Sequence, residues 1–232
     1  MDFSLDGIVI IVGNYGSGKT EIAVNIAVQH KRTGMGVRLA DLDLVNPYFR
    51  SREAREVLTQ MGIEVVLPPP QYMNADLPIL DRGVSGMIRN SNGLTILDAG
   101  GDDVGATVIA ALADALKDKP LQVFQVINPF RPYTDSLEGC QKIREEIESA
   151  AKIKITGLIG NANLIDDTGP DHIYNGQKFI QELSGQSGLP VLCITVSNNL
   201  LSAIDKAKLS YPVLPIYRQM VPPWRKTERF EQ

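Results

Sequence analysis

The chain has 232 residues, 44% of them hydrophobic, and a formal charge of −4. This length suits one large domain, so we expect a single domain over residues 1–232 with a peripheral tail from about residue 216. The acidic balance argues against a nucleic-acid-binding surface. The opening apolar run is too short to span a bilayer and lacks a basic flank, so we expect no targeting peptide, no membrane anchor and a cytoplasmic location.

Seven apolar, β-rich runs recur along the chain, and helix-length stretches separate most of them. The runs are nearly continuous in apolar residues, which is typical of parallel strands covered on both faces. The expected strands are 7–13, 36–43, 63–68, 94–100, 121–128, 153–163 and 191–196. The expected helices are 19–32, 105–118 and 136–152, and the tail 211–232 is expected to add a strand or an arm. The pattern favours an α/β fold with a mostly parallel sheet and flanking helices.

The stretch GNYGSGKT, residues 13–20, fits the pattern GxxxxGK[ST] between a predicted strand and a predicted helix. Its glycines allow backbone N–H groups to surround phosphates, and the helix N-terminus adds partial positive charge. We expect Lys19 to reach the β- and γ-phosphates and Thr20 to ligate Mg²⁺. The predicted nucleotide contacts in this region are Gly13, Asn14, Tyr15, Gly16, Ser17, Gly18, Lys19, Thr20 and Glu21.

Two acidic residues, Asp41 and Asp43, end the next predicted strand. At the carboxyl edge of a parallel sheet they would lie beside the phosphate loop, where they could hold Mg²⁺ through water or orient a nucleophilic water. The alternative is that they cap the following segment from solvent. With Lys19 they form the predicted catalytic set.

A third strand end carries Asp98, followed by Gly100 and Gly101. An acid at a strand end next to a phosphate loop is arranged to bind Mg²⁺. A glycine three residues later can bond the γ-phosphate through its N–H and move when that phosphate leaves. The predicted metal ligands are therefore Thr20, Asp41 and Asp98, and Gly101 predicts a nucleotide-dependent switch.

Together these three motifs resemble the MinD/ParA/CobQ-like nucleotide-binding proteins of the SIMIBI class of P-loop NTPases. The resemblance covers about residues 7–200. It implies a three-layer P-loop NTPase fold with a mostly parallel sheet of seven to eight strands, and a homodimer that encloses ATP and Mg²⁺. Members with a deviant loop carry a lysine, at the position of Asn14, that reaches the partner's nucleotide. Arg50 and Arg52 are the nearest candidate substitutes, although FRSRE is also typical of a solvated helix start.

The residue that contacts the nucleotide base is expected after a late strand. GTPases of this superfamily carry [NT]KxD there, whereas the stretch of this chain with Asn161 and Asn163 does not match the full motif. Asparagine at this place resembles the adenine contact of ATP-using members, so ATP is favoured over GTP. Asn128 also follows a predicted strand, and the choice among the three asparagines stays open.

The cysteines and histidines suggest no further site. Cys140 and Cys193 lie far apart, so we expect no disulfide framework, zinc site or iron–sulfur cluster, and their apolar or helical contexts suit small buried residues. His30, next to two basic residues, is expected to face solvent, and His172 to lie near a helix start.

Three functions remain open. The first is an ATP-binding switch and slow Mg²⁺-dependent ATPase whose nucleotide state regulates an unidentified client protein, with no nucleic-acid or membrane partner expected. The second is an ATP-dependent small-molecule ligase or kinase, with the proline-rich segment 67–80 as its acceptor pocket. The third is a module that holds nucleotide without turnover, which Asn14 in place of the lysine favours.

Overall fold

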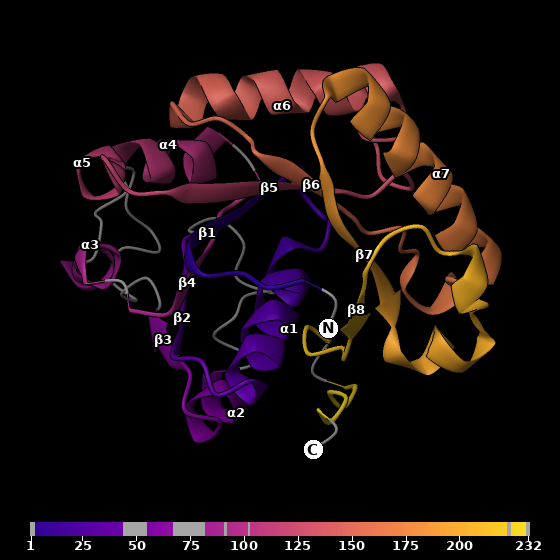
Figure 1. Cartoon of the computed structure of the whole chain (residues 1–232), viewed down its shortest axis with the longest axis horizontal. Helices are drawn as coiled ribbons and strands as arrows, with labels where there is room; N and C mark the ends of the chain where they lie inside the picture. Colours follow the sequence, from indigo (N-terminus) through magenta and orange to yellow (C-terminus); the bar gives the residue numbers. More distant parts are fainter. Residues whose placement is uncertain are drawn as a thin grey trace.

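The structure, a computed structural model, describes residues 3–43, 55–66, 82–90, 92–101, 103–221 and 224–230. These residues form an eight-stranded sheet of order β3-β2-β4-β1-β5-β6-β7-β8, and every neighbouring pair of strands is parallel (Figure 1). The strands are β1 Gly7–Val12, β2 Val37–Asp41, β3 Glu64–Val66, β4 Leu94–Asp98, β5 Leu121–Ile127, β6 Gly157–Gly160, β7 Val191–Ser197 and β8 Val213–Ile216. The predicted α/β fold with seven to eight strands is confirmed.

Helices cover both faces of this sheet. Figure 1 shows α1 and α2 on one face and α3 to α7 around the other. The helices are α1 Lys19–Arg32, α2 Arg55–Gln60, α3 Arg82–Arg89, α4 Asp103–Ala111, α5 Ala113–Leu116, α6 Leu137–Ala151 and α7 Pro170–Ser187, with 3₁₀ turns η3 Ile165–Asp167, η4 Asn198–Ala203 and η5 Lys206–Lys208. None of the helices in the described part of the chain combines the length and apolar character needed to cross a membrane.

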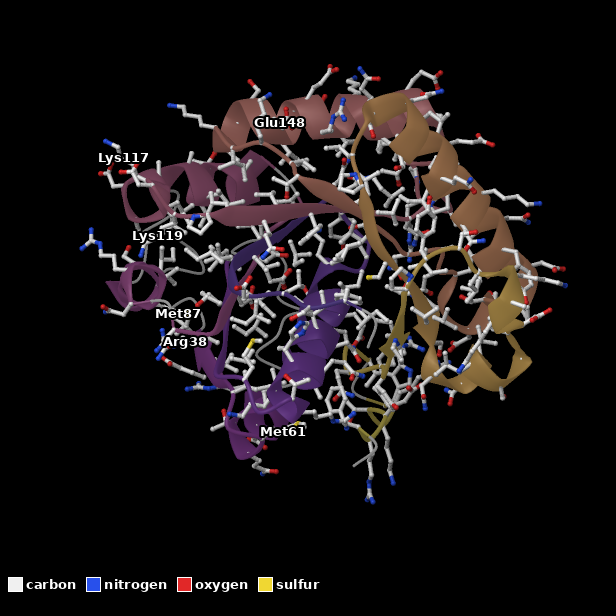
Figure 2. The ribbon with its side chains drawn as sticks, viewed as in Figure 1. Arg38, Met61, Met87, Lys117, Lys119 and Glu148 are labelled. Atoms are coloured by element: carbon white, nitrogen blue, oxygen red, sulfur yellow. The ribbon has the colours of Figure 1, made fainter. Side chains whose placement is uncertain are left out.

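Strand β1 shows why the apolar runs are continuous. Ile8, Ile10 and Val12 pack into the core that contains α3, α4 and α5, whereas Val9 and Ile11 pack into the core beneath α1. Both sets are buried, so successive side chains all need to be apolar. The charged side chain of Lys117, by contrast, lies exposed at the outside of the helical layer (Figure 2).

The parallel arrangement gathers the strand ends that carry the sequence motifs. β1, which leads into the phosphate loop, lies between β4 and β5. Asp41, at the end of β2, is the register partner of Asp98 at the end of β4. Ligand sites in open α/β sheets form at this carboxyl edge, so the fold brings the predicted site residues to one place.

The chain after β8 returns across the first helix. We call residues 217–221 and 224–230 the C-terminal arm; Figure 1 shows its yellow trace beside α1. Asn25 of α1 accepts a hydrogen bond from the amide of Tyr217 at 2.9 Å and donates to its carbonyl at 3.2 Å. Tyr217, Gln219 and Met220 are buried. The predicted strand or arm at the tail is therefore present as β8 and the arm.

Candidate nucleotide-binding site

The loop between β1 and α1 has the backbone conformation of an anion-binding turn. Gly13, Gly16 and Gly18 have φ values of 144°, 70° and 95°, a region that residues with side chains rarely adopt. The amide of Ser17 donates to the carbonyl of Asn14 at 3.2 Å, which closes the turn. Helix α1 begins directly after Gly18, which provides no side-chain cap. The first N–H groups of α1 are therefore suited to an anionic ligand.

Two glycines allow neighbouring segments to approach this loop. A Cβ at Gly13 would lie 2.7 Å from the carbonyl oxygen of Val126 on β5. A Cβ at Gly101 would lie 2.7 Å from Nζ of Lys19 and 2.8 Å from the amide nitrogen of Tyr15. The segment after β4 thus touches the phosphate loop through a residue that has room only for hydrogen at Cα. The predicted bond from Gly101 to a γ-phosphate stays a prediction.

Lys19 lies over the loop. The residue is only 7% exposed, and its Nζ donates to the carbonyl of Asn14 at 3.0 Å. An ammonium group held in this way needs little rearrangement to bind phosphate oxygens. Its placement fits the predicted contact with the β- and γ-phosphates.

The carboxylates at the strand ends lie together beneath the loop. Asp41 and Asp98 are 1% and 0% exposed. Oδ1 of Asp41 accepts the amide of Asp43 at 3.0 Å, which fixes Asp43 next to the strand end. Burial raises the pKa of Asp98 well above its ordinary value, and the negative charge of Asp41 raises it further. The Thr20 hydroxyl and the Lys19 ammonium oppose this rise.

The environment of Asp98 fits a magnesium ion. Neither carboxylate oxygen of Asp98 accepts a hydrogen bond of regular geometry from the described residues, although the nearby Thr20 hydroxyl lowers its pKa. A buried carboxylate of this kind is costly without a positive partner. Hydroxyl and carboxylate oxygens are the protein ligands that Mg²⁺ prefers. No three His, Cys, Asp or Glu side chains in the described ranges form a metal site by themselves, so such an ion would also need phosphate oxygens or water.

Asn161 supports the phosphate loop from behind. It is 4% exposed, its Nδ2 donates to the carbonyl of Ser17 at 2.6 Å, and its Oδ1 accepts from the Thr195 hydroxyl. A Cβ at Gly18 would clash with its amide group. Asn161 thus joins the end of β6 to the loop, and a contact to the base by its side chain stays a prediction.

The other two asparagines shape the loop after β6. Oδ1 of Asn163 accepts from the amide of Ile165 and from the Thr168 hydroxyl. Nδ2 of Asn128 donates to the carbonyl of Asn163 at 2.9 Å, so β5 and β6 are linked at their ends. Ile165 is half exposed with a φ of 63°, an unfavourable conformation for a β-branched residue. Strained, exposed apolar residues of this kind mark ligand-contacting loops.

Glu21 faces the C-terminal arm. Its Oε1 accepts the amide of Gln219 at 2.8 Å and its Oε2 accepts the amide of Met220 at 2.9 Å. Burial raises the pKa of Glu21 to about 7, while these two amides and the charge of Arg218 act in the opposite direction. The side chain is therefore engaged away from the phosphate loop, and a nucleotide contact at Glu21 is left to its main chain.

The raised pKa of Glu21 predicts a pH-dependent stability. The folded chain binds this proton more tightly than the unfolded chain, in which the pKa of Glu21 is near 4.5. The stability that this group contributes is therefore full below pH 4.5 and is lost as the pH rises to about 7. In Glu21→Gln the neutral amide removes this loss. We expect the melting temperature of the variant, relative to the unmodified chain, to rise across this interval. Glu138→Gln, at an exposed position of α6, is the control; equal behaviour of both variants would contradict the assignment.

One prediction about a histidine is wrong. His30 is 1% exposed: its Nε2 accepts the amide of Leu5 at 3.0 Å and its Nδ1 donates to the carbonyl of Ile26 at 3.0 Å. Burial lowers its pKa, which matches a neutral ring serving as both acceptor and donor. The N-terminal segment supplies a partner that neighbouring sequence does not reveal.

The remaining histidine and the cysteines lie where the sequence predicts. His172, in the first turn of α7, accepts the amide of Gly169 at 3.0 Å and caps that helix. Cys140 and Cys193 are buried, and burial raises the pKa of both thiols, that of Cys140 to about 12. Neither thiol is therefore an accessible nucleophile. The candidate cations Arg50 and Arg52 and the segment 67–80 lie outside the described residues.

The chain resembles signal recognition particle proteins in sequence. No family model matches it. The signal recognition particle 54 kDa protein of Saccharolobus islandicus (strain L.S.2.15 / Lassen #1) is 33% identical over 209 residues, a match that covers 78% of this chain and 45% of that protein. The chain thus spans about half the length of the curated relatives it matches.

Solved structures show the same fold. The signal recognition particle 54 kDa protein of Aeropyrum pernix K1, in complex with GDP, superposes with a TM-score of 0.55 at 17% identity, over 82% of this chain and 41% of that chain. A nucleotide-binding protein from Archaeoglobus fulgidus, in complex with ADP, gives a TM-score of 0.51 at 18% identity, over 82% of this chain and 80% of that chain. The chain therefore has the P-loop NTPase fold, while these comparisons do not assign it to the MinD/ParA/CobQ-like group.

Proposed function

We propose that the chain binds a magnesium nucleoside triphosphate at residues 13–20 and works as a slow nucleotide-dependent switch. The observation that carries this proposal is the uncapped start of α1, wrapped by a glycine loop, with the Lys19 ammonium held over it. Backbone amides, helix N-terminus and ammonium group all favour phosphate. The motif alone predicts this site, and the loop geometry supports it.

Different residues around the loop bind the phosphates, the Mg²⁺ ion and the attacking water. Lys19 binds the outer phosphates, and Thr20 and Asp98 hold Mg²⁺, which when bound neutralises charge on the β- and γ-phosphates. Asp41 and Asp43, fixed to each other through the bond to Oδ1 of Asp41, orient the attacking water. The segment 67–80 belongs to the alternative function, a ligase or kinase, and nothing in the described residues favours that alternative.

Gly101 connects the phosphates with the switch. Because Gly101 lies against Lys19 and Tyr15, its N–H is the candidate donor to a γ-phosphate bound at the loop. Loss of that phosphate would release the segment after β4. We propose that this movement changes affinity for a client protein, and that a homodimer forms around the bound nucleotide. The curated relative is by name part of a signal recognition particle, which supports a partner for this chain.

The base has two candidates, each favoured by a separate observation. Guanine is favoured by the relatives, since the Aeropyrum pernix protein was solved with GDP. Adenine is favoured by this chain's own residues. Counted from Asn161, Leu164 stands where the aspartate of [NT]KxD would lie; counted from Asn163, that position is Asp166, whose carboxylate is bound by Arg218 and Arg225, and Leu164 replaces the lysine. Guanine selectivity needs an acceptor for two ring donors, which Leu164 cannot supply and which Asp166 could supply only by giving up its ion pairs with Arg218 and Arg225. We therefore propose ATP as the first candidate and GTP as the second.

Competition binding tests the proposal. A fluorescent adenine nucleotide is bound to the purified chain with Mg²⁺, and unlabelled ATP and GTP are titrated against it, with a parallel series in chelator. We expect ATP to displace the probe at lower concentration than GTP, and chelation to weaken binding. Stronger displacement by GTP would transfer the assignment to the second candidate. Absence of binding by either nucleotide would contradict the whole proposal.

A further inference from the structure

The segment after β5 is attached to the phosphate loop at Asn14. Nδ2 of Asn14 donates to the carbonyl of Pro132 at 2.9 Å, and its Oδ1 accepts the amide of Tyr15 at 2.8 Å. Both ends of this side chain are thus used within the protein. Since β5 lies next to β1 in the sheet, residues 128–134 flank the loop on one side, while Gly101 flanks it on the other.

Hydrogen bonds fix residues 128–134 in one conformation. The amide of Arg131 donates to the carbonyl of Asn128 at 3.1 Å, and the Thr134 hydroxyl donates to the same carbonyl at 2.7 Å. Oδ1 of Asn128 accepts the amide of Phe130 at 3.1 Å. Thr134 is fully buried. A side chain that projects from this turn therefore has a well-defined origin.

Arg131 projects from this turn onto the phosphate loop. Its Nε, Cδ and Cζ atoms lie 3.7, 3.9 and 3.9 Å from the position that a Cβ of Gly16 would take. Nε is buried and has no hydrogen-bond acceptor among the described residues. An N–H donor that is removed from water without an acceptor is unfavourable. A phosphate oxygen at the loop would supply the missing acceptor, and the planar guanidinium matches phosphate geometry.

The position along the loop indicates which phosphate is involved. Gly101, the proposed contact of the outermost phosphate, approaches the loop at Tyr15. Arg131 approaches at the next residue, Gly16, from the side of β5. The two segments therefore bracket the same end of the loop, away from the first turn of α1.

We propose that Arg131 binds the terminal phosphate of the nucleotide in cis, and so distinguishes a triphosphate from a diphosphate. This inference rests on the proposed function. It also gives a role to Asn14, which stands where related loops have a lysine. In this chain Asn14 instead holds the turn that carries Arg131. The cation in this protein then comes from its own β5–α6 connection and needs no second subunit.

Affinities for triphosphate and diphosphate test the inference. Dissociation constants for a non-hydrolysable triphosphate analogue and for the diphosphate, both with Mg²⁺, are measured for the unmodified chain, Arg131→Ala, Arg131→Lys and Arg89→Ala. Arg89 is exposed on α3 and serves as the control. We expect Arg131→Ala to weaken triphosphate binding about 10- to 100-fold and diphosphate binding less than about threefold. Arg131→Lys should restore part of the triphosphate affinity.

The outcomes separate this inference from the proposed function. Equal losses for triphosphate and diphosphate in Arg131→Ala, or no loss for either, would overturn the role of Arg131 while the unmodified chain still binds nucleotide. If the unmodified chain binds neither nucleotide, the proposed function itself fails. Thermal melting of the nucleotide-free variants shows whether each is folded. If Arg131→Ala does not fold, the ratio of triphosphate to diphosphate affinity in Arg131→Lys decides: an unchanged ratio would contradict the inference.

Discussion

Replacement of Lys19 by alanine is expected to lower affinity for the magnesium nucleoside triphosphate by about 100-fold or more. Lys19 is only 7% exposed as a residue, and its ammonium group lies over the loop, where it donates to the carbonyl of Asn14. Its loss removes the charge that the outer phosphates would meet, while the backbone amides stay in place. Calorimetric titration of the nucleotide measures the change.

The fold itself is expected to survive this replacement. The hydrogen bond from Nζ of Lys19 to Asn14 lies within the phosphate loop. Its loss should lower the free energy of unfolding by about 1 kcal/mol, so the melting temperature of the nucleotide-free variant should change by only a few degrees. Lys142→Ala removes an equal charge from an exposed position on α6 and should bind nucleotide like the unmodified chain. Unchanged affinity in Lys19→Ala would remove the basis of the proposed function.

Asp98→Asn is expected to make the nucleotide-free protein more stable and to abolish the effect of Mg²⁺ on nucleotide binding. The carboxyl group is fully buried beside Asp41, and its raised pKa shows that the ionised form is disfavoured in the fold. At neutral pH a neutral amide avoids that cost, so we expect a gain of about 1–3 kcal/mol in the free energy of unfolding.

Two measurements on Asp98→Asn are needed together. Chemical denaturation of the nucleotide-free protein reports stability, and nucleotide titrations with Mg²⁺ and with chelator report the metal dependence. Asp6→Asn, at an exposed position before β1, controls for the charge change and should alter neither. A less stable Asp98→Asn protein would contradict the unfavourable burial of the carboxylate. Retained Mg²⁺ dependence would exclude Asp98 as a ligand.

The strand pattern and the phosphate loop could be predicted because their causes are local. Buried parallel strands need apolar residues on both faces, and β1 shows this in its two alternating sets. A loop that surrounds phosphate needs glycines at fixed spacing. Helix α1 has the predicted bounds, Lys19–Arg32. The predicted helix 105–118 is two helices, α4 and α5, with Leu112 between them.

Other features depend on contacts between distant segments. For helix α7 the sequence predicted only a start near His172 and not its extent, although Gly169 before it, Pro170 at its first position and Gly188 after it are helix-boundary residues. His30 is buried because Leu5 and Phe3 cover it, and Glu21 is engaged because the C-terminal arm returns to α1. Such partners are invisible to local periodicity.

Arg131 illustrates the same limit at the site. In the sequence it is one arginine in a short segment after a strand, where Asn128 drew attention as a polar strand end. Only the pairing of β5 with β1 brings it beside Gly16. The useful sequence feature was the position, because Asp98 and Arg131 follow β4 and β5, the two neighbours of the phosphate-loop strand.

Hydrogen–deuterium exchange of the unmodified chain, with and without a magnesium nucleoside triphosphate, tests the central claim most directly. The account predicts that saturating ATP slows exchange at least about tenfold in peptides covering residues 13–20, with further protection around Gly101. GTP at concentrations that bind should protect the same peptides. Binding of either nucleotide without protection of residues 13–20, or no binding of either, would contradict the account.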